Sequence, residues 1–102
     1  MDVVREFQRG AMRLNVLHHA AAGEVHGAWL IEELGRHGYR VSPGTLYPLL
    51  ARLEAAGLLR SRLEVVEGRQ RRRYRATPEG RKALAACRRA LRELAGEVLG
   101  RP

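Results

Sequence analysis

Residues 42–59 read SPGTLYPLLARLEAAGLL, and this stretch decides the fold. Apolar residues recur in it with the i, i+3, i+4, i+7 spacing that marks one face of an α-helix: Leu46, Leu49, Leu50, Leu53 and Gly57. Ser42 can cap this helix through its hydroxyl, and Pro43 takes the first helical position, where a missing N–H costs nothing. Pro48 removes one hydrogen bond, at up to about 3 kcal/mol, but it falls in the second turn, where bending is more tolerable. We therefore predict a helix that begins at Pro43 and turns its leucines inward.

The outward side of this helix is low and smooth. A step of 100° per residue places four small residues outermost and three larger ones beside them: Gly44, Pro48, Ala51 and Ala55, flanked by Thr45, Tyr47 and Arg52. A solvated helix would carry Lys, Glu or Gln on that ridge, whereas small side chains suit entry into a DNA groove about 12 Å wide. Free N–H groups near Gly44 and Thr45 suit a phosphate oxygen. The alternative is a helix packed against another protein surface.

The segment before this helix contains two further helical patterns. A first helix is predicted over Val3–Ala22, with a loose or bent start near Gly10. Leu30, Ile31 and Leu34 then form the apolar stripe of a short second helix that ends at Gly38. The remaining residues, 39–41, are long enough only for a brief strand.

The segment after it alternates and then becomes helical again. Leu59–Val66 has the period of a half-buried strand, Glu67–Gln70 forms a turn, and Arg71–Ala76 returns as the partner strand. Thr77 and Pro78 begin a last helix that runs to about Leu99. This order predicts a mainly α fold with a small β-hairpin: a winged helix-turn-helix over residues 1–77, followed by a C-terminal dimerisation helix over residues 78–102.

Positive charge is concentrated on the predicted hairpin. The 102-residue chain has 19 Lys and Arg against 11 Asp and Glu, a net charge of +8. Seven arginines and two glutamates lie between Arg60 and Arg75, so more than half of the excess sits there. A general bias toward arginine does not predict this clustering. The cluster favours a polyanionic ligand, with the hairpin along a phosphate backbone or in a minor groove. The alternative is a solvated basic loop.

Other classes of function find little support. Cys87 is the only cysteine, which excludes an internal disulfide, and no apolar run reaches the roughly 20 residues of a membrane span, so we expect a cytoplasmic protein without membrane contact. The four histidines lack metal-site spacing, and no nucleophile with a base, carboxylate pair or phosphate loop is recognisable. We predict neither an enzyme nor a metal or cofactor protein.

Apolar residues at both ends of the chain predict a two-fold dimer. The last helix has a seam of steps of three and four, and the first helix has a stripe of its own: Leu84, Cys87, Leu91, Leu94 and Val98, with Val3, Phe7 and Leu14. Both stripes exceed what one small core can cover. Trp29 lies opposite the stripe of the second helix, so we expect it to be partly exposed. A contact with a ligand, a contact with a dimer partner and incidental surface exposure are the three alternatives for it.

Several motifs together resemble those of PadR-type transcriptional regulators: His26-Gly27, SPGTLYP at 42–48, Arg52-Leu53-Glu54, Gly57-Leu58-Leu59 and RRYRATPEG at 72–80. The resemblance spans about Arg9 to Leu84. It implies a homodimeric repressor on a palindromic operator, released in some members by a phenolic or multidrug ligand. The helix that begins at Pro43 would be the recognition helix, and Glu67–Arg71 would be the wing. Ala28 and Trp29 depart from the family, which commonly has Tyr and an acidic residue after His-Gly.

These observations give one set of predicted contacts with double-stranded DNA: Ser42, Pro43, Gly44, Thr45, Tyr47, Arg52, Arg69, Arg71, Arg72 and Arg73. A small aromatic effector at Trp29 is the further expectation. The alternative function is a winged-helix module that binds an acidic protein partner. An RNA-binding role has less support, because the aromatic residues are too scattered for a stacking platform.

Overall fold

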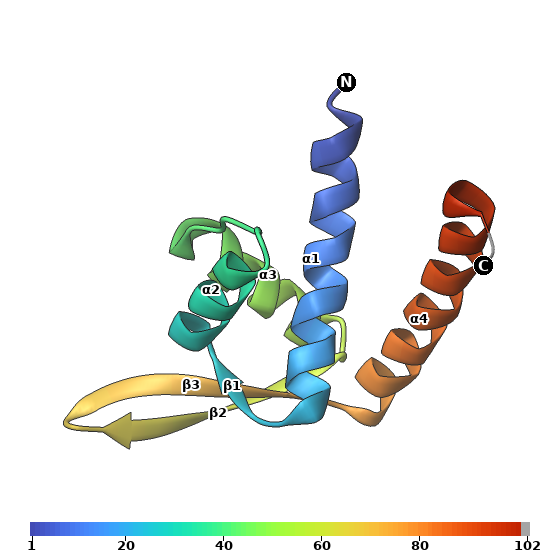
Figure 1. Cartoon of the computed structure of the whole chain (residues 1–102). Helices are drawn as coiled ribbons and strands as arrows, with labels where there is room; N and C mark the ends of the chain where they lie inside the picture. The colour runs from blue at the N-terminus through green and yellow to red at the C-terminus, as the bar shows by residue number, and fades with distance from the viewer. Residues whose placement is uncertain (101–102) are drawn as a thin grey trace.

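Four helices and a small antiparallel sheet form the protein, described over residues 1–100 in a computed structural model (Figure 1). The elements in chain order are α1 (Val3–Ala22), β1 (Val25–His26), α2 (Gly27–Arg36), α3 (Pro43–Ala55), β2 (Leu59–Val66), β3 (Arg69–Ala76) and α4 (Pro78–Leu99). The predicted mainly α winged-helix fold is confirmed. Helix α1 continues through Gly10 without interruption, so the expected loose start is wrong.

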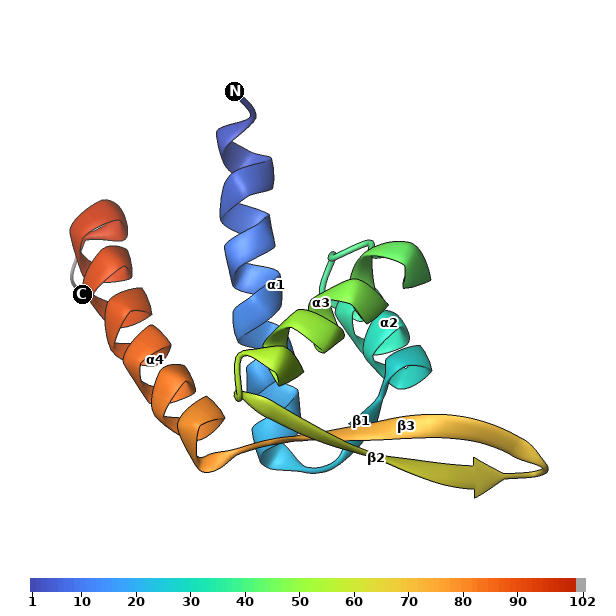
Figure 2. The ribbon, with the colours of Figure 1, turned by 180° about the vertical axis from the view of Figure 1, so that it is seen from behind.

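The core lies where α1, α2, α3 and one face of the sheet meet. The leucines of α3 are buried as predicted, and Leu46 and Leu50 are fully enclosed. They pack with residues from every other major element: Val16 and Leu17 of α1, Leu30 and Leu34 of α2, Leu59 and Tyr74 of the hairpin, and Leu84 of α4. Figure 2 shows these helices on one side of the sheet, whose other face is left open.

The third strand lies elsewhere than the sequence predicted. Residues 39–41 form no strand, because the Tyr39 N–H donates to the Leu34 carbonyl at 2.9 Å and Gly38 takes a left-handed φ of 86°. These contacts close the end of α2 instead. Val25 and His26, between the first two helices, form β1, and Val25 pairs with Tyr74, so the sheet order is β1-β3-β2.

The hairpin turn is tighter than predicted. Only Glu67 and Gly68 connect the strands, with φ of 52° and 76°, and Val66 pairs directly with Arg69. Two residues with positive φ match the twist of antiparallel strands. Both strands consequently reach eight residues, and the wing projects as a long ribbon beyond the helices (Figure 1).

The junction between hairpin and α4 is a buried hydrogen-bonded corner. Thr77 Oγ1 accepts from the Gly80 N–H at 3.0 Å, which confirms the predicted cap, and donates to the Gly57 carbonyl at 2.6 Å. Gly80 lies so close to the Leu58 carbonyl that a Cβ would overlap it. Leu84, one turn later, is only 3% exposed. Its assignment to a dimer seam is therefore wrong, because the first turns of α4 already pack on the chain's own core.

Candidate nucleic-acid interface

The outward ridge of α3 is exposed, as its spacing predicted. Gly44, Pro48, Ala51 and Ala55 all face solvent, and Tyr47 beside them is 45% exposed. No charged side chain stands on the ridge itself, and the helix stays continuous through Pro48. The fold therefore presents a helix whose exposed spine is narrow enough to approach base edges.

The start of α3 differs from the sequence prediction. The Ser42 hydroxyl makes no bond to a helical N–H; it donates to Thr45 Oγ1 at 3.3 Å. The Ser42 carbonyl instead accepts from the N–H groups of Thr45 and Leu46, at 3.0 and 2.9 Å. The predicted hydroxyl cap is wrong, because Thr45 offers its own hydroxyl as the acceptor. The Thr45 N–H, expected to be free for a phosphate, is already satisfied.

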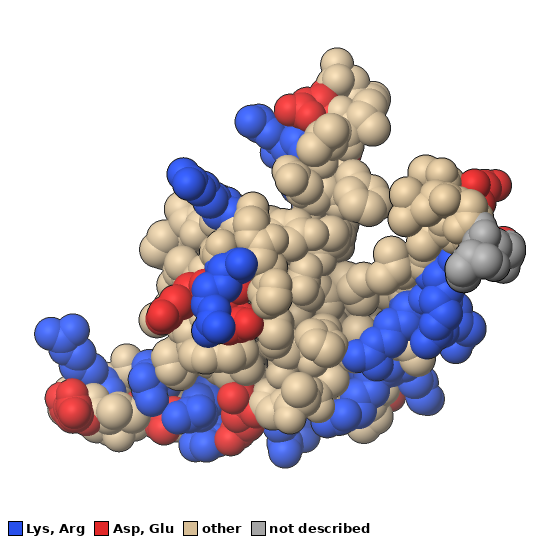
Figure 3. Space-filling view, in the orientation of Figure 1, with Lys and Arg blue, Asp and Glu red and all other residues tan. Residues whose placement is uncertain are grey.

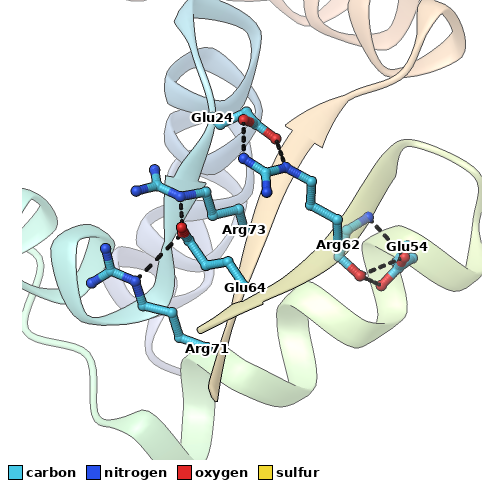
Figure 4. Close-up of polar contacts among 7 residues, drawn as sticks. Glu24, Glu54, Arg62, Glu64, Arg71 and Arg73 are labelled. Carbon is cyan, nitrogen blue, oxygen red and sulfur yellow. Dashed lines mark hydrogen bonds and ion pairs between the residues drawn. The ribbon is translucent and has the colours of Figure 1, made fainter. Parts of the chain in front are cut away.

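A polar tether joins α3 to the wing. The Glu54 carboxylate accepts from the Ser61 N–H at 3.0 Å and from the Ser61 hydroxyl at 2.8 Å (Figure 4). Arg72, on the neighbouring strand, donates to the same hydroxyl at 3.1 Å. These contacts set the wing relative to α3 and place the Arg72 guanidinium on the α3 side of the sheet. Sequence reasoning missed the tether, although Glu54 was the one acidic residue in the helix.

The strand register divides the hairpin into two faces. Ser61 pairs with Tyr74 and Leu63 with Arg72, so these four residues share the face that carries the helices. Of the seven hairpin arginines, only Arg72 lies on this inner face. The other six lie on the outer face: Arg60, Arg62, Arg69, Arg71, Arg73 and Arg75. Arg71 and Arg73 are partly buried there, and the other four are exposed.

The inner face of the wing is apolar beyond the reach of the helices. Leu63 and Val65 were predicted on the buried face of a half-buried strand, yet they are 55% and 68% exposed. The alternation holds at Leu59 and Ser61 and fails further out, because no helix covers the distal part of the ribbon. Leu63 and Val65 therefore stand beside Arg72 as an exposed apolar surface.

Two glutamates hold three of the outer arginines. Glu24 binds Arg62 through two bonds of 2.9 Å, and the Arg62 guanidinium holds the pKa of the Glu24 carboxyl below its usual range (Figure 4). Glu64 binds Arg73 and lies 3.5 Å from Arg71 Nε. Within the described chain, Arg69 has no such carboxylate partner. Among the predicted DNA contacts, Arg69 and Arg72 are thus the more available, whereas Arg71 and Arg73 are engaged.

Trp29 is partly exposed, as predicted, at the edge of a surface hollow. Its indole meets the His19 ring edge to face, with centroids 5.3 Å apart. His26, Arg73 and Gly23 also line this hollow. Arg73 connects the hollow to the wing, so a molecule bound beside Trp29 would contact a wing residue.

The expected dimer residues form exposed stripes on α1 and α4, except Leu84. Val3 and Phe7 are more than half exposed, Leu14 is half-buried, and the α4 residues all face solvent: Cys87, Leu91, Leu94 and Val98. Figure 1 shows the two helices diverging above the sheet. Residues 101–102 of the predicted dimerisation segment lie outside the described chain.

Neither metal ligands nor a membrane segment gather in the described chain. The histidines make separate contacts, His37 with Glu33 at 3.3 Å and His18 with Arg88 at 3.0 Å. Over residues 1–100, no three residues with metal-binding side chains converge. In the same range, every helix is too short or too polar to cross a bilayer.

Residues 16–86, which contain α2, α3 and the wing, match the family described as Transcriptional regulator PadR-like family. The chain belongs to this family. It is 72% identical over 97 residues to a protein of Mycobacterium tuberculosis named Transcriptional regulator Rv3488, covering 95% of this chain and 91% of that one. This PadR-like chain is therefore a transcriptional regulator, which implies DNA binding.

Solved PadR-like structures share the whole fold. A PadR family regulator from Eggerthella lenta is 33% identical, with a TM-score of 0.79 over 97% of this chain and 90% of its own. A PadR-like regulator from Bacillus cereus is 27% identical, with a TM-score of 0.83 over 91% and 92%. The likeness includes α4, so the PadR-like architecture extends beyond the matched residues 16–86.

Proposed function

We propose that this PadR-like protein is a cytoplasmic, sequence-specific repressor rather than an enzyme, and that it binds a palindromic operator as a homodimer. The observation that carries the proposal is the exposed, uncharged ridge of α3 held beside Arg72 by the Glu54–Ser61 tether. A narrow ridge fits the major groove, and a basic wing fits the adjacent backbone or minor groove.

Different residues of this interface would contact different parts of the DNA. Tyr47, Arg52 and Thr45 flank the ridge and would read base edges, while Ser42, Pro43 and Gly44 bring the start of α3 close to the backbone. Arg72 and Arg69 would contact phosphates. Arg71 and Arg73 would act through the shape of the wing, since Glu64 holds them.

Dimerisation would use residues 78–102 and α1. Burial of the exposed apolar side chains on these helices would remove apolar surface from water and so stabilise a dimer. A two-fold axis would bury both stripes at once. Two α3 helices related by that axis would meet two half-sites of a palindrome. In this proposal residue 77 is the boundary between the DNA-binding domain and the dimerisation helix.

The hollow beside Trp29 would admit a small aromatic effector. The Trp29 and His19 rings offer aromatic faces and edges, and Arg73 offers a cation in the lining. Binding there would disturb the Arg73–Glu64 contact and therefore the wing. Titration with phenolic compounds, followed by tryptophan fluorescence and operator release, tests this part of the proposal.

Selection of bound fragments from genomic DNA tests the central proposal. We expect a palindromic sequence whose affinity falls by orders of magnitude between about 50 and 200 mM salt while its preference over other duplexes persists. Equal affinity for every duplex would contradict sequence-specific repression. Binding only to an acidic protein would favour the alternative, an interaction module.

A further inference from the structure

Most of the basic side chains lie away from the α3 side of the sheet. The outer face carries six arginines, and only Glu24 and Glu64 offset them there. Alternation along a strand fixes this placement, since neighbouring residues point to opposite faces. A duplex seated on the α3 ridge meets the inner face and the wing tip, so arginines at the base of the outer face, such as Arg60 and Arg75, point away from it.

Helix α4 continues this basic surface. Four exposed basic residues recur in steps of one, three and seven along one side of the helix: Arg81, Lys82, Arg89 and Arg92. Arg88 does not belong to this side, because it turns toward α1 and binds His18. The apolar stripe with Leu91 and Leu94 occupies a different side, which leaves the basic side outside the proposed dimer contact. Figure 3 shows Lys and Arg atoms along the lower edge of the sheet and onward along the outer edge of α4.

We define the outer basic surface as the outer-face arginines except Arg69, which the proposed function places on the operator, together with these four residues of α4. Its nine basic side chains and two carboxylates leave a charge of +7, against +8 for the whole chain. The rest of the protein is therefore close to neutral. In the described chain the ion pairs of this surface join Glu24 to Arg62 and Glu64 to Arg71 and Arg73, and Glu24 also attracts Arg75. Two carboxylates cannot offset nine cations, so most of the positive charge of the surface remains.

Such a field favours an extended polyanion. The surface runs along a strand pair and a helix of 22 residues, which suits the regular phosphate spacing of a duplex more than a compact anion. Trp29, in the hollow beside Arg73, adjoins this surface as a single ring, so successive bases of a single strand find no row of aromatic side chains among its described residues. Arginine heads without carboxylate partners are the groups that release counterions from phosphates.

We propose that the outer basic surface binds the backbone of a second duplex segment, so that the protein on its operator holds another stretch of DNA. This inference rests on the proposed operator function of α3. It assigns the surface no sequence preference, because its contacts are with phosphates. The strength of the second contact therefore depends on salt and on the α4 cations.

The test uses the full chain and two kinds of duplex. A complete palindromic operator, attached to a support, is loaded with protein, so that both α3 helices of a dimer are occupied. A labelled mixed-sequence duplex without operator is then added, and its capture is measured between about 50 and 200 mM salt. The variant Arg81→Gln, Arg89→Gln, Arg92→Gln is compared with the control Arg5→Gln, Arg9→Gln, Arg36→Gln, which removes the same charge elsewhere.

We expect the α4 variant to lose at least about tenfold in capture of the second duplex, and its salt slope to fall by about three. Its affinity for the immobilised operator should stay within about twofold of the parent, and the control should keep both properties. Equal capture by the two variants, or no capture by the parent protein, would overturn the inference while operator binding stands. An operator affinity that falls as much as capture would also overturn it.

A second variant separates this inference from the proposed function. Tyr47→Ala with Arg52→Ala should lose operator preference and still bind the mixed-sequence duplex through the outer basic surface. Adding the three α4 substitutions should then reduce that residual binding by at least about tenfold. Residual binding that the α4 substitutions leave unchanged would contradict the outer surface, even if no operator can be recovered.

Discussion

The phenol ring of Tyr47 lies directly over Gly27, in the space that a Cβ of residue 27 would occupy. The first residue of α2 thereby sets the position of a side chain on α3. Two motifs that are far apart in the sequence, His26-Gly27 and SPGTLYP, meet at this contact. It gives a structural reason for a glycine at the start of α2 that does not depend on backbone conformation.

Gly27→Ala should therefore displace Tyr47 without unfolding the protein. The overlapping atoms are the far end of a half-exposed side chain, which can swing aside at little cost in stability. We expect operator affinity to fall about tenfold, the size of one lost base contact, and the thermal midpoint to change little. Fluorescence anisotropy with operator and mixed-sequence duplexes measures the effect. An unchanged operator affinity would show that the Tyr47 position does not matter for recognition.

Gly80→Ala, unlike Gly27→Ala, should mainly lower the stability of the fold. The overlapping atom is the Leu58 backbone carbonyl, which is held by a bond from the Thr77 N–H at 3.1 Å and cannot move independently. We expect the free energy of unfolding to fall by about 2 to 4 kcal/mol. Urea denaturation of Gly80→Ala beside Gly35→Ala, at a helical glycine with open space around its Cα, makes the comparison. A loss below about 1 kcal/mol would contradict tight packing at this corner.

Leu84 and Leu94 should respond differently to truncation although they share one helix. Leu84 is buried in the chain's own core, so Leu84→Ala should cost about 2 to 4 kcal/mol of unfolding free energy. Leu94 is 41% exposed, so Leu94→Ser should leave the fold intact and weaken the dimer. Analytical ultracentrifugation at micromolar concentration distinguishes them. A parent protein that is monomeric there would refute the proposed dimer.

Loss of the Glu54 tether should disturb the wing, although Glu54 is not itself a proposed DNA contact. Glu54→Ala removes the acceptor of both Ser61 bonds and leaves the Ser61 N–H without it. We expect a loss of about 1 to 3 kcal/mol in stability, together with weaker operator binding because the Ser61 hydroxyl that accepts from Arg72 loses its own partner. Ser61→Ala keeps the backbone bond but removes that hydroxyl, so it should cost less stability while still weakening operator binding. Equal losses of stability in the two variants would argue against the backbone bond as the main contact.

Stability should decline as the pH falls below about 6.5. Burial lowers the pKa of His26, with nearby Arg71 and Arg73 acting in the same direction, and burial also lowers the pKa of His19. The unfolded chain therefore takes up protons first, so stability is full above the unfolded pKa and is lost as the pH falls toward the folded pKa. Neutral His26 also accepts from the Trp29 N–H at 3.2 Å, which a protonated ring cannot do.

His26→Asn isolates this contribution. Asparagine can cap α2 in the same way but does not titrate. Thermal unfolding between pH 7.5 and 5 should show a shallower decline for the variant than for the parent. A decline of equal steepness in both proteins would assign the pH dependence to other groups.

The sequence by itself determined the local elements and the side of α3 that is exposed. The leucine spacing of 46–53 requires one buried face, and the opposite ridge then has to face outward whatever the leucines contact. The Thr77-Pro78 start of α4 was equally predictable, because a cap is formed by residues within one turn. The high density of positive charge in the hairpin was also predictable, because counting charges in a segment does not require the strand register.

Only the tertiary structure decided which face each arginine occupies and which arginines are already held. A two-residue turn instead of four fixes the register, and the register places Arg72 on one face and its neighbours on the other. The partners Glu24 and Glu64 are 38 and nine residues away from the arginines they hold. Contacts over such separations depend on where the core brings the strands together, which no local pattern contains. For the same reason Val25 became a strand, and Leu84 joined the core instead of the dimer seam.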